Sequence, residues 1–256
     1  METYTSATQI NTQQPAKTNL DYYTSKKLES LLNDHSNNMH LDTGQTIDFI
    51  SAKFLGTPYQ ANMLIGAENT PEKLVIDFRG LDCFTYLDYI EALRKSTSQP
   101  EFVKHLIQTR YVDGNISFLS RKHLFTDWAD SKSQSLADDI TAQISTDAVS
   151  VEKNLNRKAD DGAYLPGLPT VKRNITYIPS NLVNEKIVSR LRTGDSIGIY
   201  TQLSGLDVPH VGFFIMTDKG PVFRNASSQI ANKKVVDAPF IEYIAKTPGI
   251  IIFRTK

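Results

Sequence analysis

The sequence predicts an α+β fold, with helices first and a run of antiparallel strands after them. In the first half of the chain, apolar residues recur at the three- and four-residue spacing of amphipathic helices. In the last third, short runs rich in β-branched and aromatic residues are separated by turn residues, and Asp218-Lys219-Gly220 joins two of them as a hairpin. No internal repeat is present. We therefore predict one domain over residues 21–256.

The helices are predicted from apolar periodicity and from the signals that end a helix. Gly56, followed by Pro58, ends the second helix, and Gly80 precedes the third. The third helix has the clearest apolar face, formed by Leu87, Ile90 and Leu93. The predicted helical segments are residues 25–33, 43–55, 83–96, 101–105 and 182–191, with a helical turn at 241–246.

The strands are predicted from short apolar runs between turn residues. They lie at residues 196–202, 210–216, 221–225, 235–238 and 250–255. Residues 74–78 form a short strand or an extended lead-in, and Asp113-Gly114 marks a further hairpin or turn. The stretch 130–180 is polar, weakly patterned and interrupted by Leu165-Pro166-Gly167-Leu168-Pro169. We interpret residues from about 110 to 180 as a large insertion that decorates the core.

The composition excludes some function classes. Lys plus Arg equals Asp plus Glu, 28 against 28, so charge gives no argument for nucleic acid or an anionic membrane as a partner. No apolar run is long enough to cross a bilayer, and a single cysteine allows no internal disulfide. Residues 1–20 are polar and are predicted to be a disordered leader, which is not a signal peptide as written.

Cys83 is the single cysteine and lies at the predicted start of the third helix. The free N–H groups and the positive dipole end of a helix N-terminus favour a thiolate over a thiol. Cys83 is therefore a candidate nucleophile. The alternative is a buried, unreactive side chain, which is the usual state of a free cysteine.

A cysteine nucleophile needs a base, and the base needs a group that orients it. His210 is the candidate base, because it opens a predicted strand directly after a loop. The hairpin at 218–220 brings Asn225 back close to His210, where its carbonyl oxygen can accept the Nδ1–H of the imidazole. Two alternatives stay open: a His210 bonded only to backbone at a sheet edge, and an Asn225 that only ends a strand.

These residues, in this order, resemble the NlpC-type papain-like cell-wall peptidases. The resemblance rests on a tyrosine after Gly56-Thr57-Pro58, a cysteine at a helix start and a histidine that opens a strand. A closer resemblance is to the N-acetylmuramoyl-L-alanine amidase-like family within that group. Its features lie between about residues 54 and 228, at Phe54-Leu55-Gly56-Thr57-Pro58-Tyr59, Leu81-Asp82-Cys83-Phe84-Thr85-Tyr86, Arg110-Tyr111-Val112-Asp113-Gly114, residues 120–128 and Pro209-His210-Val211-Gly212.

The resemblance implies a papain-like core, in which helices pack on a central antiparallel sheet, with a large insertion. It implies that Cys83 is the nucleophile and His210 the base. Asn225 falls where the family has a third polar residue, which is a histidine in many NlpC-type enzymes. Tyr59 matches an upstream tyrosine whose hydroxyl, with the backbone N–H of Cys83, holds the oxyanion. By its sequence context alone, Tyr59 is equally explained as an aromatic residue packed after a turn.

His123, Asp127 and Trp128 belong to the motif at residues 120–128 and are predicted to line the substrate cleft. Trp128 would offer a flat apolar face to a sugar or a peptide stem. The alternatives are local packing for Trp128 and a turn or cap for Asp127. His123 and Asp127 have the spacing of a helical metal pair, but no third ligand is near and the stretch lacks a helical pattern. We predict no metal and no cofactor.

We therefore predict a cysteine amidohydrolase that cuts an amide bond in peptidoglycan stem peptides, the family name indicating the N-acetylmuramoyl-L-alanine bond. The alternatives are a γ-D-glutamyl-diamino acid endopeptidase, a relative that transfers acyl groups or cleaves lipid esters, and a non-catalytic cell-wall binding domain. Expected partners are peptidoglycan fragments or muropeptides. The protein is expected to be a monomer in the periplasm or cell envelope of a bacterium, with a cytoplasmic location left open.

Overall fold

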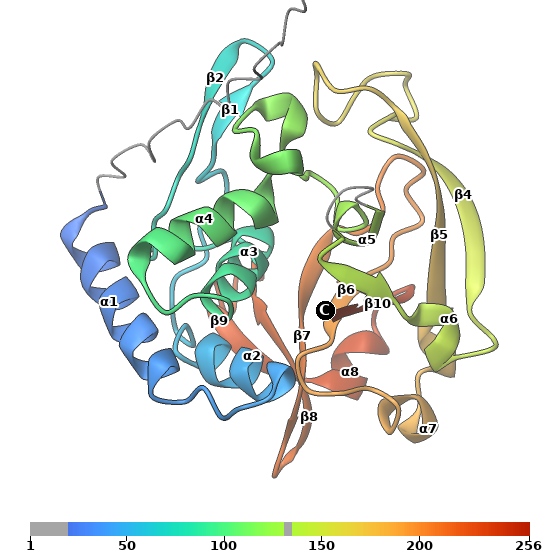
Figure 1. Ribbon diagram of the computed structural model, residues 1–256. Helices are drawn as coiled ribbons and strands as arrows, with labels where there is room; N and C mark the ends of the chain where they lie inside the picture. Colours follow the sequence, from blue (N-terminus) through green and yellow to red (C-terminus); the bar gives the residue numbers. More distant parts are fainter. Residues whose placement is uncertain (1–19, 131–134) are drawn as a thin grey trace, which may run out of the picture.

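The computed structural model describes residues 20–130 and 135–256, so the leader expected at residues 1–20 lies almost wholly outside the described residues. Within these two ranges, one antiparallel sheet of eight strands forms the centre, and helices pack on it (Figure 1). The predicted α+β fold, with helices on a central antiparallel sheet, is confirmed.

The sheet runs in the order β4-β5-β10-β6-β7-β8-β9, and β3 pairs with β10 beside this path. A separate small hairpin is formed by β1 and β2. The strands are β1 Ile65–Ala67, β2 Thr70–Lys73, β3 Ala137–Asp139, β4 Val149–Leu155, β5 Val171–Pro179, β6 Ser196–Ile199, β7 His210–Thr217, β8 Gly220–Ala226, β9 Val235–Pro239 and β10 Gly249–Thr255.

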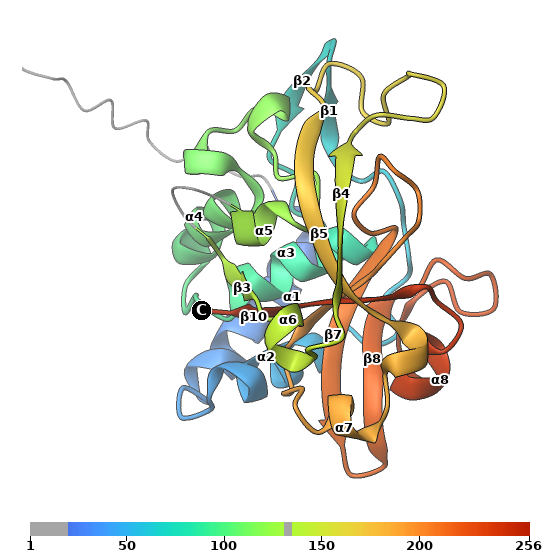
Figure 2. The ribbon, with the colours of Figure 1, turned by 90° about the vertical axis from the view of Figure 1, so that its right-hand side faces the viewer.

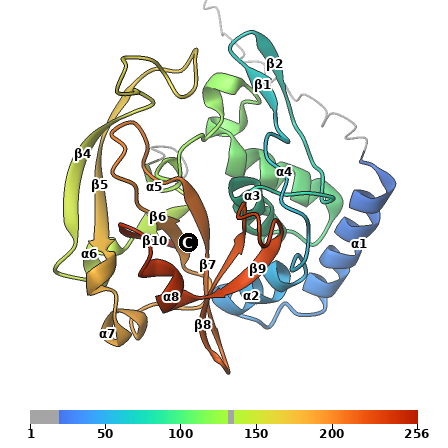
Figure 3. The same cartoon turned by 180° about the vertical axis from the view of Figure 1, so that it is seen from behind.

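The helices form two groups. The four longer ones, α1 to α4, lie together in the first half of the chain, and the short α6, α7 and α8 lie elsewhere along the sheet (Figures 1 and 3). The helices are α1 Tyr22–Ser36, α2 Thr43–Ala52, α3 Cys83–Leu93, α4 Gln99–Arg110, α5 Asp127–Asp130, α6 Thr141–Ile144, α7 Glu185–Val188 and α8 Phe240–Ile244, with 3₁₀ turns at Val112–Gly114, Phe118–Ser120 and Ser180–Leu182.

Strand alternation divides the apolar residues between two cores. On β10, Ile251 and Phe253 join the core shared with α1 to α4, whereas Ile250 and Ile252 join the core shared with α6, α7 and α8. The central strands can be apolar on both faces because both faces are covered. The helix α3 lies against β7 and β8 in the first core, which brings the start of α3 close to the start of β7.

The stretch predicted to be an irregular insertion supplies two strands of the main sheet. The strands β4 and β5 pair from Val149–Tyr177 to Leu155–Val171, and β5 joins the sheet through β10 (Figure 2). The prediction of an irregular decoration over 130–180 is therefore wrong. The strands escaped detection because β4 and β5 form one end of the sheet and carry polar side chains on their open face.

The structure decides between the alternatives of two other local predictions. Residues 74–78 were expected to be a short strand or an extended lead-in to the third helix; they form no strand, and they connect the hairpin β1–β2 to the segment before α3. Near Asp113-Gly114 the chain forms 3₁₀ turns after a longer α4, so of the predicted hairpin or turn it is the turn that forms. Both residues have positive φ, at 53° and 68°, which is why Asp-Gly suits this turn.

Candidate active site

The helix α3 begins at Cys83, as predicted, because a reciprocal cap fixes its first turn. Asp82 accepts a hydrogen bond from the Thr85 N–H at 2.7 Å, and the Thr85 hydroxyl accepts one from the Asp82 N–H at 3.1 Å. Tyr86, fully buried, donates to the Ser51 carbonyl at 2.9 Å and ties α3 to α2. The cysteine is thus presented from the first position of a helix that is held at both its cap and its buried face.

The start of β7 lies against Cys83. The ladder between β7 and β8 runs from Thr217–Gly220 to Phe213–Arg224 and stops there. The backbone N–H groups of Val211, Cys83 and Phe84 lie near the Cys83 thiol and favour its charged form. A side chain at Gly212 would meet the Arg224 carbonyl oxygen at 2.6 Å, so glycine is needed for this close approach. Cys83 therefore lies near the residue that follows His210 in β7.

The hairpin of β7 and β8 brings His210 and Asn225 together, with Nε2 of the ring 2.9 Å from the Asn225 Oδ1. The Asn225 Nδ2 donates to the Phe223 carbonyl at 3.0 Å, which orients the amide so that its oxygen faces the ring. An amide oxygen only accepts, so Nε2 carries the proton and Nδ1 is the basic nitrogen of the neutral ring. The sequence-based assignment of this bond to Nδ1 is wrong, since Asn225 approaches from the other side of the imidazole.

The site holds its thiol and imidazole in neutral form. Burial, together with the nearby Asp82 carboxylate, raises the pKa of the Cys83 thiol to about 12, against hydrogen bonds that favour the thiolate. Burial also lowers the pKa of His210, against the opposing hydrogen bond to Asn225. The N–H groups at the helix N-terminus do favour a thiolate, as expected from the sequence, but burial and the charge of Asp82 outweigh them, so the pKa of the thiol rises instead.

Two tyrosines, Tyr59 and Tyr243, lie near enough to Cys83 for its charge to affect their pKa values. Tyr59 is half-buried, and its backbone N–H donates to the Lys233 carbonyl at 2.8 Å. Burial raises the pKa of Tyr59 and of Tyr243, and negative charge at Cys83 adds to the shift in both. Tyr243 lies on α8, with its ring 4.9 Å from that of Phe223. Sequence reasoning missed Tyr243, because only the return of the chain after β9 brings α8 to the site.

The loop that leads into His210 is held by two charged side chains from other parts of the chain. Lys153 on β4 donates from Nζ to three loop carbonyls, those of Thr201, Leu203 at 3.0 Å and Leu206 at 2.9 Å. Asp207 accepts from the N–H and hydroxyl of Thr126 at 2.8 and 2.9 Å. These bonds fix residues 201–207 and, through them, the position at which His210 enters β7.

Lys153→Met is expected to lower the free energy of unfolding by about 2–4 kcal/mol, because three loop carbonyls lose a donor whose own side chain is buried. Methionine keeps the length of the side chain, so packing changes little. Urea denaturation measures the loss. Lys172→Met, on the neighbouring strand and exposed to solvent, is the matched control and should change stability by no more than about 0.5 kcal/mol. Equal losses in the two variants would contradict a clamp at Lys153.

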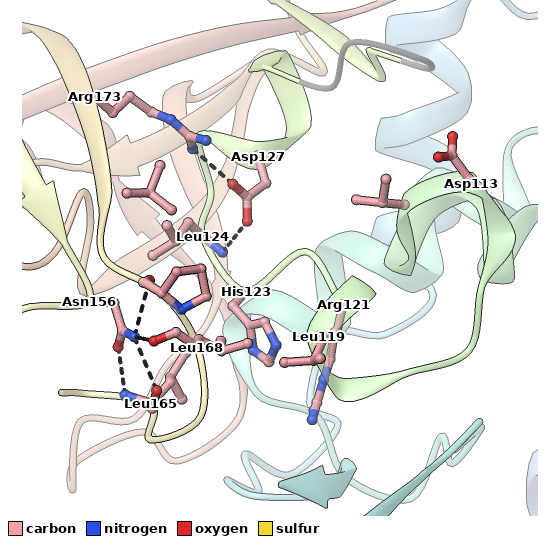
Figure 4. A pocket seen from close by; sticks show the side chains of 13 residues that line it. Asp113, Leu119, Arg121, His123, Leu124, Asp127, Asn156, Leu165, Leu168 and Arg173 are labelled. Atoms are coloured by element: carbon pink, nitrogen blue, oxygen red, sulfur yellow. Dashed lines mark hydrogen bonds and ion pairs between the residues drawn. The ribbon is translucent and has the colours of Figure 1, made fainter. Parts of the chain in front are cut away.

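The residues predicted to line a substrate cleft do not all do so. His123 and Asp127 line a cavity of about 450 Å³ between the 112–127 segment and β5 (Figure 4). Trp128 does not: it is 0% exposed, and its ring contacts that of Phe84 inside the core. The prediction that Trp128 offers a face to substrate is wrong in this structure, because Trp128 lies on the inward side of the short helix α5.

Asp127 is engaged within the protein. One carboxylate oxygen accepts from the Leu124 N–H at 3.0 Å, and the other pairs with Arg173 at 2.8 Å. No group of three or more His, Cys, Asp or Glu side chains in the described ranges is placed to hold a metal ion. In the same ranges, no helix is both long and apolar enough to cross a membrane.

Comparison with protein families and with solved structures identifies relatives of this chain. Residues 49–250 match the model of the AmiA-like family, described as N-acetylmuramoyl-L-alanine amidase-like. An N-acetylmuramoyl-L-alanine amidase from Bacteroides uniformis is similar in structure, with a TM-score of 0.69 and 27% identity over 83% of this chain and 98% of that one. A protein from Legionella pneumophila has a TM-score of 0.72 and 26% identity over 90% of this chain and 95% of that one. No curated protein matches the sequence.

Proposed function

The chain belongs to the N-acetylmuramoyl-L-alanine amidase-like family, and from that premise we propose that it is a cysteine amidohydrolase that cuts the N-acetylmuramoyl-L-alanine bond of peptidoglycan fragments. One observation carries the proposal: Cys83 opens a capped helix close to the start of β7, where Asn225 accepts a hydrogen bond from Nε2 of His210. The same arrangement supports placing the chain among the NlpC-type papain-like enzymes.

In the proposed first step, the Cys83 sulfur attacks the lactyl carbonyl carbon while Nδ1 of His210 takes the thiol proton. The neutral resting pair makes proton transfer part of the attack, since no preformed thiolate is stabilised. Negative charge then develops on the carbonyl oxygen. The backbone N–H of Cys83 and the Tyr59 hydroxyl are the donors we assign to that oxyanion.

In the proposed second step, the imidazolium of His210 gives its proton to the amine of L-alanine as the C–N bond breaks. A water molecule then attacks the thioester, losing a proton to His210, and Cys83 leaves as the thiol when the tetrahedral intermediate collapses. Asn225 keeps Nε2 protonated throughout, so that Nδ1 alone exchanges protons. The products are a free muramoyl acid and a free peptide amine.

We further propose muropeptides as the partners of a monomeric protein in the bacterial cell envelope, because that compartment contains the proposed bond. The alternative is that the thioester intermediate passes its acyl group to an acceptor other than water, or that it forms from a lipid ester. No side chain described at the site favours either reaction.

Mass analysis of products from a defined disaccharide-tripeptide tests the proposed bond. We expect a disaccharide with a free lactyl acid and an intact tripeptide with a free L-alanine amine. A disaccharide that keeps L-alanine and D-glutamate would contradict the proposal and identify a γ-D-glutamyl endopeptidase instead. Unchanged substrate, with an intact fold by circular dichroism, would favour a binding domain.

A further inference from the structure

The cavity beside α5 is lined mostly by apolar side chains and has no role in the proposed chemistry (Figure 4). Its volume of about 450 Å³ is within the range of small-molecule sites. The apolar lining comes from both walls, with Leu119 and Leu124 on one side and Leu165, Leu168 and Val171 on the other.

One wall of this cavity is built in advance. Asn156, which is buried, donates from Nδ2 to the carbonyls of Leu165 and Leu168 at 3.1 and 2.9 Å, and its Oδ1 accepts from the Leu165 N–H at 2.7 Å. These bonds hold residues 165–169 in one conformation along the cavity wall. Because Asn156 already holds this loop in one conformation, a ligand that binds against the loop would not have to order it, which is what preorganisation means for a binding site.

His123 supplies the cavity with an acceptor. Its Nε2 lies 2.7 Å from the Phe118 carbonyl oxygen, so that nitrogen carries the proton and Nδ1 is left as a lone-pair acceptor. Burial lowers the pKa of His123, and the charge of Arg121 adds to the effect, so the ring is neutral. The ring can accept a hydrogen bond from a hydroxyl or an amide N–H.

The charges around the cavity disfavour an anion. Arg173 is paired with Asp127 (Figure 4). The Arg121 guanidinium pairs with Glu72 at 3.0 Å. Asp113, at the rim, has no such pair among the described residues. The peptide stem of a muropeptide carries carboxylates, whereas both arginines that line this cavity already pair with carboxylates of the protein. A neutral ring with hydroxyl and acetamide groups matches both the acceptors and the apolar walls.

The cavity is linked to both halves of the catalytic pair. Thr126, next to Asp127, binds Asp207 three residues before His210. Trp128, one residue further, packs on Phe84, the neighbour of Cys83. On the opposite wall, the Asn156 N–H donates to the Gly205 carbonyl in the loop that leads to His210. The cavity walls and the catalytic pair are therefore positioned by the same segments of the chain.

We propose that this cavity binds the N-acetylated sugar of the substrate, with His123 and Asp127 as hydrogen-bond acceptors and the leucine walls against its acetyl and C–H groups. The inference rests on the proposed amidase function. It assigns to residues 119–127 and 156–173 the recognition of the glycan side of the scissile bond.

Leu119→Asp tests the assignment, because Leu119 is 69% exposed and its replacement leaves the core intact. The direct readout is saturable binding of N-acetylglucosamine to the Cys83→Ala protein, followed by NMR. We expect binding that Leu119→Asp weakens by at least about tenfold. Met39→Asp, 61% exposed and outside the cavity, is the matched control and should bind unchanged. No saturable binding, or binding indifferent to Leu119, would overturn the assignment.

A second readout compares two substrates with the same amide bond. One carries the N-acetylated sugar, and the other is a lactoyl-tripeptide without it. Leu119→Asp should lower kcat/KM for the first by about tenfold and leave the second unchanged. An equal loss on both, or Leu119-dependent binding of the free tripeptide, would place the stem in the cavity and reject the glycan assignment. Since sugar binding needs no hydrolysis, failure of the amidase proposal alone leaves the first readout intact.

Discussion

Cys83→Ala is expected to lower kcat for release of the stem peptide by at least about 10⁴-fold, because loss of a covalent nucleophile removes the whole thioester route. The substitution should leave the fold unchanged. Alanine is the best helix former, and the cap of α3 is made by Asp82 and Thr85 without the thiol. Release of peptide from a defined muropeptide, followed by mass spectrometry, measures the effect.

The control for this prediction is Ser25→Ala, a change of similar size on α1 and away from the site. Its turnover should equal that of the unmodified protein. Undiminished turnover by Cys83→Ala would reject the cysteine mechanism outright. The rate of alkylation of the thiol does not distinguish a catalytic Cys83 from a buried, unreactive one. With a pKa of about 12, slow labelling at neutral pH is expected in both cases.

The parts of the site that the sequence predicted are those that depend on short-range structure. The start of α3 at Cys83 follows from the Asp82 cap, and the approach of Asn225 to His210 follows from a tight hairpin. In both cases the partners are within 15 residues of each other, so turn chemistry and strand pairing fix their relation.

The parts that the sequence did not predict depend on long-range packing. Tyr243 reaches Cys83 across 160 residues of chain, and no local pattern marks it. Trp128 looked like an exposed ligand platform, but its burial depends on Phe84, far away in sequence. The strand β4 was missed because Lys153 interrupts its apolar face, although that lysine is buried with three carbonyl partners from another loop.

Asn225→Ala is expected to lower kcat by on the order of 10²-fold, because the ring of His210 loses the acceptor that fixes its tautomer and orientation. Asn225 is 0% exposed, so the change also leaves the Phe223 carbonyl without its donor. Asn225→Asp also removes the donor to the Phe223 carbonyl but keeps the volume and the oxygen that accepts from Nε2, so the difference between the two variants reports on that acceptor. Asn174→Ala, exposed on β5, should leave kcat unchanged.

The pH dependence of kcat/KM tests whether His210 is the catalytic base. Burial lowers the pKa of His210 below its ordinary value of 6.5, and the base must be neutral, so activity should persist below pH 6.5 and fall only as pH drops through the lowered pKa. In Asn225→Asp a carboxylate faces the ring and favours its protonated form, which raises the pKa of His210. The acid limb should therefore move to higher pH in that variant. An acid limb that does not move would show that His210 is not the base, because the charge beside it would then have no titration to shift.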